Sequence, residues 1–122
     1  MKLLAKNEEV ISFLSDKESL ISGTIKKISI QIKSNILFIG LDITLMYSKK
    51  YKSIYLEFEA IKEYGFYYLA DSSFSTIEIY KFFKNENLFY ISFDPTNEEL
   101  IMDKNDNDFI LAEKVSLYQS SG

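Results

Sequence analysis

Apolar and polar residues alternate with a period of two through most of the chain beyond its N-terminal segment. In the segment that starts at Thr24, isoleucines at 28, 30 and 32 alternate with polar side chains at 29, 31 and 33, which is typical of a half-buried β-strand. Ser34 and Asn35 then predict a tight turn into the next strand. The same alternation continues over 36–47 and again over 54–59. The pattern therefore predicts three consecutive strands joined by short loops.

The second half of the chain has the same period, with an interruption between residues 60 and 75 where one further strand is possible near Tyr67. Apolar side chains at alternate positions predict three more strands, over 77–83, 89–93 and 109–117. A polar cluster over 84–87 predicts a turn between the first two. Glu113 falls on the apolar phase of the last strand, so we expect a bulge or an exposed end there.

The N-terminal segment has a helical pattern instead. Asn7 is a suitable helix cap, and the acidic Glu8 and Glu9 would occupy the favourable first turn. Apolar residues between positions 10 and 14 form one face, a second helical turn is expected through residue 21, and Gly23 ends the segment. We expect this helix to pack on the sheet.

These elements predict an α+β fold in a single domain over residues 1–122, a length ordinary for one domain of ~100–150 residues. A short N-terminal helix would pack on a curved, mainly antiparallel sheet of six or seven strands. Short turns and the lack of helical crossovers after Gly23 favour a meander order, and the sheet would roll into a half-barrel.

Composition removes most enzymatic chemistry. The chain has no cysteine and no histidine, so it lacks a cysteine nucleophile, a thiolate zinc site, the commonest general base and the commonest metal ligand. All fourteen basic residues are lysine, and the net charge is −4, which argues against nucleic-acid binding. The apolar stretch at residues 3–5 is too short for a signal peptide, and no run approaches the ~20 residues of a membrane helix. We expect a soluble, cytoplasmic, non-enzymatic protein without a cofactor.

An acidic run over 94–108 carries the most distinctive chemistry, with six carboxylates and one lysine between two predicted strands. A calcium loop starting at Asp103 matches at its third and fifth positions. It fails where Asp108 replaces the required glycine and Lys114 replaces the bidentate glutamate. The charge is asymmetric: residues 1–61 carry a net +2 and residues 62–122 a net −6. Such a field is either a solvated face or a surface that steers a basic partner.

The order of segments resembles that of the small immunity proteins that neutralise bacterial polymorphic or contact-dependent toxins. The resemblance rests on a helical start leading into Leu20–Ile25, a strand at Ile54–Ile61, a strand at Leu88–Pro95, and an acidic loop before Phe109–Ala112. It implies that the protein acts by binding, with a cognate toxin domain as partner, often a basic nuclease. On this basis we expect eight partner-binding residues: Asp94, Glu98, Glu99, Asp103, Asp106, Asp108, Tyr67 and Tyr68.

Two other functions stay open at the level of sequence. The first is a non-enzymatic β-rich scaffold, or a domain that holds a small apolar ligand or peptide in a cavity lined by Leu41, Phe58 and Phe89. A filled core would count against this alternative. The second is a calcium-dependent module built on the acidic run.

Overall fold

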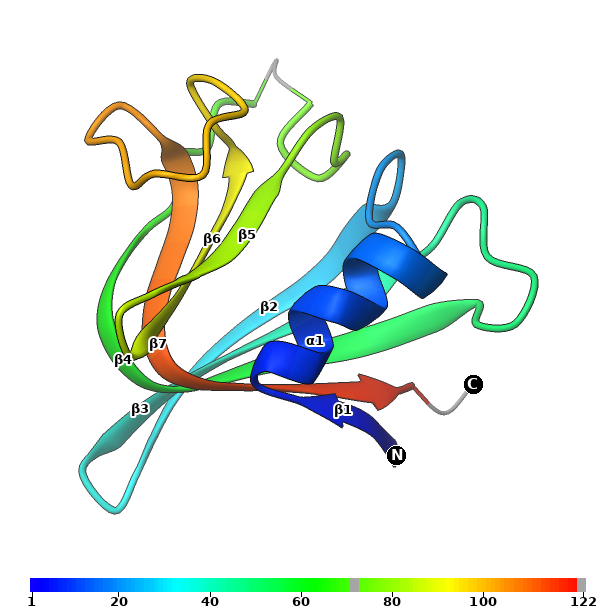
Figure 1. Ribbon diagram of the computed structural model, residues 1–122, viewed down its shortest axis with the longest axis horizontal. Helices are drawn as coiled ribbons and strands as arrows, with labels where there is room; N and C mark the ends of the chain where they lie inside the picture. The colour runs from blue at the N-terminus through cyan, green and yellow to red at the C-terminus, as the bar shows by residue number, and fades with distance from the viewer. Residues whose placement is uncertain (71–72, 121–122) are drawn as a thin grey trace.

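The computed structural model describes residues 1–70 and 73–120 and places seven strands in one sheet (Figure 1). The helical elements are α1 (Glu8–Ser12) and the π-helical turn η1 (Phe13–Lys17) that continues it. The strands are β1 (Lys2–Lys6), β2 (Thr24–Lys33), β3 (Ile36–Thr44), β4 (Ser53–Gly65), β5 (Lys81–Asn85), β6 (Leu88–Asp94) and β7 (Asn107–Gln119). Among these described elements, no helix has the length and apolar character needed to cross a membrane.

The expected α+β class is confirmed, and every pair of neighbouring strands is antiparallel. The strand order is β2-β3-β4-β7-β6-β5, with β1 also paired to β7. The predicted meander therefore holds in two halves, β2-β3-β4 and β5-β6-β7, but not across the chain. The connection after β4 carries the chain to the far edge of the sheet, and the last strand enters the centre beside β4. Alternation along each strand predicts its two faces but carries no information about its neighbours.

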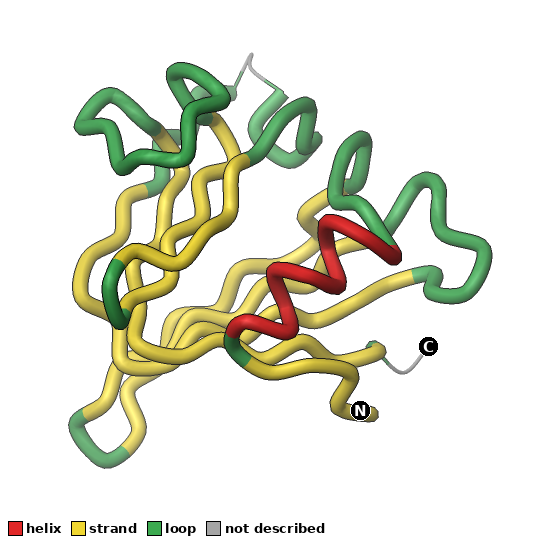
Figure 2. Tube along the Cα trace, viewed as in Figure 1, coloured by secondary structure: helices red, strands yellow, loops and turns green. Residues whose placement is uncertain are grey.

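The two central strands, β4 and β7, both bend sharply partway along their length, and this bend folds the sheet on itself (Figures 1 and 2). The backbone of β4 is irregular at Ala60, whose φ of 60° lies in the left-handed region, and the register with β7 shifts just beyond it, between Ile61 and Glu63. On β7 the buried phase changes, because Ala112 and Val115 are both buried while Glu113 between them is exposed. Glu113 is exposed as expected but lies within β7 rather than at its end, and the register shift falls on β4 between Ile61 and Glu63. The change of phase on β7 marks where the two halves meet, since β6 pairs with β7 up to Ala112 and β1 pairs from Ser116 onward.

The helical segment lies inside the bend. Val10, Phe13 and Leu14 bury their side chains in the core that the two halves share. Two contacts join the segment to β5 and the residue before it: the Tyr80 hydroxyl donates to the Leu14 carbonyl at 2.9 Å, and Lys84 Nζ of β5 lies 3.2 Å from Glu8 Oε2. Burial of these apolar side chains, together with the two contacts near β5, therefore fixes the helical segment over the concave side of the sheet.

Two expectations about the N-terminal segment are wrong. Asn7 precedes α1 as predicted but does not cap it: its Oδ1 accepts a hydrogen bond from the Val115 amide at 3.1 Å, which attaches the helix start to β7. The chain is extended after Lys17, so the second helical turn is not formed. In addition, β1 was not predicted, since three apolar residues between lysines are too few for a strand pattern.

The two halves also meet at the open side of the sheet. The Ile25 amide donates to the Ser75 carbonyl at 2.7 Å, and the Ile77 amide donates to the Gly23 carbonyl at 2.9 Å. The described sheet is nonetheless not closed into a barrel. Leu41, Phe58 and Phe89 belong to the continuous buried core. The Phe58 ring packs edge-on against the Phe82 ring, with 6.4 Å between the ring centroids. Their packing counts against a ligand cavity lined by these three residues.

Gly40 on β3 provides a test of this packing. The Tyr55 side chain of β4 crosses the position, so that a Cβ at residue 40 would overlap the tyrosine ring and hydroxyl. We expect Gly40→Ala to lower the free energy of unfolding by about 1 to 3 kcal/mol, as overpacking does. In a Tyr55→Ala background the same substitution should be neutral or stabilising, because alanine suits a strand better than glycine. Urea unfolding of the four proteins measures both effects, and an equal penalty in both backgrounds would contradict the assignment.

Candidate functional site

The loop between β6 and β7, residues 95–106, contains most of the predicted acidic run and is called the acidic loop below. Its ends are set by Asp94 at the end of β6 and Asn107 at the start of β7. Asn107 Nδ2 donates to Asp94 Oδ2 at 3.4 Å across the base of the loop. The acidic loop thus leaves and re-enters the sheet through two neighbouring strands.

A buried carboxylate inside the loop holds its conformation. Asp106 Oδ1 accepts a hydrogen bond from the Thr96 amide at 2.9 Å, and Oδ2 accepts one from the Asp103 amide at 3.3 Å. The Tyr90 hydroxyl donates to Oδ2 at 2.6 Å, and Lys81 Nζ lies 2.9 Å from the same oxygen. The side chains of Lys81 and Asp106 are almost completely buried. One carboxylate therefore links the acidic loop to β5, to β6 and to its own backbone.

The electrostatics of this cluster follow from the contacts. Burial alone would raise the pKa of Asp106, but the hydrogen bonds from Tyr90, Lys81 and two backbone amides outweigh it and hold the pKa below the ordinary value of 3.8. Burial also raises the pKa of the Tyr90 hydroxyl, and the adjoining Asp106 charge raises it further. The cluster therefore contains an ionised carboxylate and a neutral tyrosine over the physiological range.

The outer part of the acidic loop combines exposed charge with exposed apolar surface. Glu98 and Glu99 are exposed, and three apolar side chains follow them with 63%, 52% and 44% of their surface accessible: Leu100, Ile101 and Met102. Two short polar turns order the backbone on either side. Asn97 Oδ1 accepts from the Glu99 amide at 3.0 Å, and Asp103 Oδ1 accepts from the Asn105 amide at 2.8 Å. The loop therefore presents these side chains from an ordered backbone.

The structure places the six predicted carboxylates in two groups. Four of them lie at the surface or partly exposed: Asp94, Glu98, Glu99 and Asp103. Asp106 and Asp108 are instead buried, and their carboxylates accept hydrogen bonds from the protein itself. The expectation that all six form an exposed rim is corrected for these two. A count of acidic residues cannot separate the groups, because both consist of Asp or Glu flanked by polar residues.

The two predicted tyrosines lie in the connection between β4 and β5, at the same end of the molecule as the acidic loop (Figure 1). Tyr67 and Tyr68 are both exposed. The Tyr67 amide donates to Asp108 Oδ1 at 2.8 Å, and the Tyr68 ring packs edge-on against Phe74 at 5.4 Å. The structure thus brings the predicted tyrosines and the predicted carboxylates to one end, joined through the buried Asp108.

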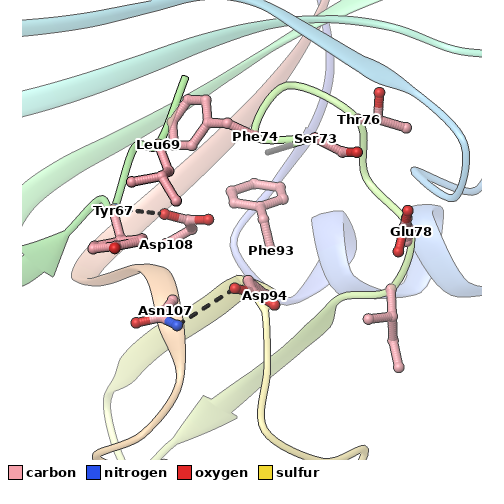
Figure 3. Close-up of a pocket in the computed structure, with 11 residues that line it drawn as sticks. Tyr67, Leu69, Ser73, Phe74, Thr76, Glu78, Phe93, Asp94, Asn107 and Asp108 are labelled. Carbon is pink, nitrogen blue, oxygen red and sulfur yellow. Dashed lines mark hydrogen bonds between the residues drawn. The ribbon is translucent and has the colours of Figure 1, made fainter. Parts of the chain in front are cut away.

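Two grooves flank this end of the molecule. One, of about 390 Å³, lies between the β4–β5 connection and the β6–β7 strand ends, and Asp94, Asp108 and Phe93 are in its wall (Figure 3). The other, of about 500 Å³, separates the helical segment from β5 and has Glu98 and Leu100 at its edge. The surface of the acidic loop is therefore continuous with concave surface on both sides.

Metal chemistry has little structural basis here. Within residues 1–70 and 73–120 there is no group of three or more acidic, histidine or cysteine side chains arranged to hold an ion. Two side chains of the calcium alternative make contacts within the protein: Asp103 Oδ1 accepts from the Asn105 amide, and Asn107 Nδ2 donates to Asp94 Oδ2. Comparison with protein-family models, with curated proteins and with solved structures gives no match.

Lys81 and Tyr90 are the functional residues that sequence reasoning missed. Both support the acidic loop from neighbouring strands, although neither belongs to the acidic run. Lys81 did carry a signal: it continues the apolar phase of Ile77 and Ile79, where a lysine needs a buried anionic partner. No comparable signal singles out Tyr90 among the nine tyrosines.

The buried pair predicts a large stability difference between two similar neutralisations. Asp106→Asn would leave Lys81 charged and unpaired inside the protein, so we expect it to cost about 3 to 5 kcal/mol of unfolding free energy. Glu99→Gln also removes one negative charge, but from the exposed part of the loop, and should change the free energy of unfolding by less than about 0.5 kcal/mol. Adding Lys81→Met to Asp106→Asn should recover part of the loss. Urea unfolding measures all four proteins, and equal effects of Asp106→Asn and Glu99→Gln would contradict the buried-pair assignment.

The same cluster predicts part of the acid sensitivity. The pKa of Asp106 is lower in the folded protein than its ordinary value of 3.8, so its contribution is complete above that value and is lost as the pH falls toward the folded pKa. We expect the unfolding free energy of the wild type to fall more steeply, as the pH is lowered below about 4, than that of the Lys81→Met/Asp106→Asn protein. Parallel curves from urea unfolding at successive pH values would show that Asp106 is not responsible.

Proposed function

We propose that this chain is a cytoplasmic immunity protein, which binds and neutralises a cognate bacterial toxin domain through the acidic loop and the adjoining tyrosines. The observation that carries the proposal is the construction of the loop. A buried, fully bonded Asp106 fixes a backbone that exposes Glu98 and Glu99 beside the apolar Leu100 and Ile101. Ordering the loop before contact reduces the entropic cost of binding.

The charge distribution supports a basic partner. The half of the chain that contains the acidic loop has a net charge of −6, against +2 for the other half. Exposed carboxylates on one end of a molecule accelerate and orient the approach of a positively charged surface. A nuclease that binds nucleic-acid phosphates has such a surface, and the exposed carboxylates Asp94, Glu98, Glu99 and Asp103 would occupy it in place of phosphates. The same field disfavours direct binding of nucleic acid.

The apolar side chains supply the other part of a protein interface. Leu100, Ile101 and Met102 are exposed together on the acidic loop, and Tyr67 and Tyr68 are exposed at the same end. Strong interfaces combine a small number of apolar and aromatic anchors with a charged rim. A solvated face needs no group of three exposed aliphatic residues, so their presence supports binding over a merely solubilising role.

A binding role also agrees with the chemistry that the chain lacks. Neither histidine nor cysteine is present to act as base or nucleophile. The carboxylate with the most restrained environment, Asp106, is bonded to Lys81, Tyr90 and two backbone amides. Such a carboxylate has no free position from which to act on a substrate. We therefore propose inhibition by occupation of the toxin surface, without turnover and without a cofactor.

The test starts from the toxin domain expected in the protein encoded beside this chain's gene. Co-expression of the chain should restore growth of cells that produce this domain. Charge reversal of Glu98, Glu99 and Asp103 to lysine should slow association of the purified proteins by about tenfold or more at low salt and flatten its salt dependence. Stopped-flow or surface-based kinetics at several salt concentrations measure the rate.

A matched control carries the same change in net charge elsewhere: Glu9, Glu57 and Glu113 to lysine, on the helix, the outer sheet face and the bend. We expect this protein to retain most of the association rate. Equal slowing by both triple variants would assign the effect to total charge, and failure of the wild type to rescue growth would reject the immunity function itself.

A further inference from the structure

The groove between the β4–β5 connection and the ends of β6 and β7 has an unusual wall. It contains the carboxylates of Asp94, Asp108 and Glu78. It also contains the aromatic rings of Phe93 and Phe74. In Figure 3 the Asp108 carboxylate lies between the Phe74 and Phe93 rings and the Tyr67 backbone. Negative charge and ring faces therefore meet around one open space of about 390 Å³.

The negative charge of this wall is not neutralised within the described part of the chain. Among the described residues that line the groove there is no lysine. None of the three carboxylates, Asp94, Asp108 and Glu78, takes part in an ion pair of the described residues. Only 8% of the Asp108 surface is accessible, and among the described residues its carboxylate accepts one hydrogen bond, from the Tyr67 amide. Burial is the main cause that raises the pKa of Asp108, and the neighbouring Asp94 charge adds to it against the Tyr67 hydrogen bond.

Asp108 thus differs from the other buried carboxylate of this region. Asp106 is compensated by the Lys81 charge and by three further hydrogen-bond donors, which stabilise its ionised form. Asp108 faces the groove beside a second carboxylate, and its raised pKa means that its ionised form destabilises the fold near neutral pH. A cation entering the groove would remove this cost.

We propose that this groove receives an arginine side chain from the basic partner, with Asp108 and Asp94 binding its guanidinium and the ring of Phe93 packing against its plane. The inference deepens the proposed function and rests on it, since the partner is the toxin domain that meets the acidic loop. The groove adjoins that loop through Asp94 and Asn107, so one partner surface would cover both.

The chemistry of the wall favours guanidinium over other cations. A guanidinium is planar, stacks on aromatic faces and directs five N–H donors in its plane, so that it can bond two carboxylates at once. An ammonium group is a compact, strongly hydrated charge that gains less from ring faces. A metal ion would need several oxygen ligands, and the described residues form no group of three candidate ligands here.

The first experiment uses a minimal probe, Nα-acetyl-arginine N-methylamide, titrated into the ¹⁵N-labelled protein at low ionic strength. The Tyr67 amide reports directly, because it donates to Asp108 Oδ1. We expect a saturable shift of this resonance, with affinity at least threefold higher than for the matching lysine derivative. The uncharged norleucine derivative should cause no such shift. Three results would each overturn the proposal: no shift with the arginine derivative, an equal shift with the norleucine derivative, or equally tight binding of the lysine derivative.

The second experiment uses Asp108→Asn, which removes the charge and keeps the shape and the acceptor for Tyr67. Asparagine tolerates the φ of 52° at this position, so the variant is suited to fold. We expect arginine-probe affinity to fall by about tenfold, the difference of one strong charge-assisted bond. Glu113→Gln changes the net charge equally at the exposed bend and should leave probe affinity unchanged. Equal losses in the two variants would overturn the assignment to Asp108.

A stability measurement separates lost binding from lost structure. Since the ionised Asp108 destabilises the fold, Asp108→Asn should unfold at the same or higher urea concentration than the wild type. A variant that loses both probe binding and stability would show that Asp108 is structural and overturn its role as a ligand. The proposed function is judged separately: rescue of growth with unchanged probe binding in Asp108→Asn would reject the groove site alone. Probe binding without rescue would reject the toxin partner.

Discussion

The end of the protein that carries the acidic loop depends on one constraint, the compensation of the buried negative charge of Asp106. An ionised carboxylate inside a protein destabilises the fold unless a cation and hydrogen-bond donors compensate its charge. Here the cation comes from β5, the hydroxyl from β6, and two of the donors from the acidic loop itself. Satisfying one charge therefore determines where a loop of twelve residues lies and which of its side chains face outward.

Local pattern predicted most of the secondary structure and little of its arrangement. Alternating isoleucines located β2 and β3, and Ser34–Asn35 formed the expected turn, with both residues at positive φ. The position of β7 between β4 and β6 could not be predicted, because partner choice depends on the shape of the whole core. The same limit applied to the site: Glu98 and Asp106 look alike in sequence, and only the buried Lys81 opposite one of them separates their roles.

The two buried aspartates illustrate opposite uses of desolvated charge. Asp106 is surrounded by donors and serves the architecture, whereas Asp108 has one recorded donor and a like charge nearby. Groups of the second kind lower stability, and they are typical of sites that exchange water for a ligand. The two aspartates lie only two positions apart in the sequence, at the point where the backbone passes from the acidic loop into β7. Asp108 has a left-handed backbone conformation there.

The central position of β7 also has a consequence for how the protein forms. β7 pairs with β1, β4 and β6, so the segment at the end of the chain completes contacts with elements from its beginning and its middle. Contacts between such distant segments are slow to form, since the intervening chain must be ordered first. During synthesis, the earlier strands would wait with unpaired edges until β7 emerges. β7 is therefore the strand that joins the β2-β3-β4 half to β6 and β5, and the sheet is complete only once it has paired with both.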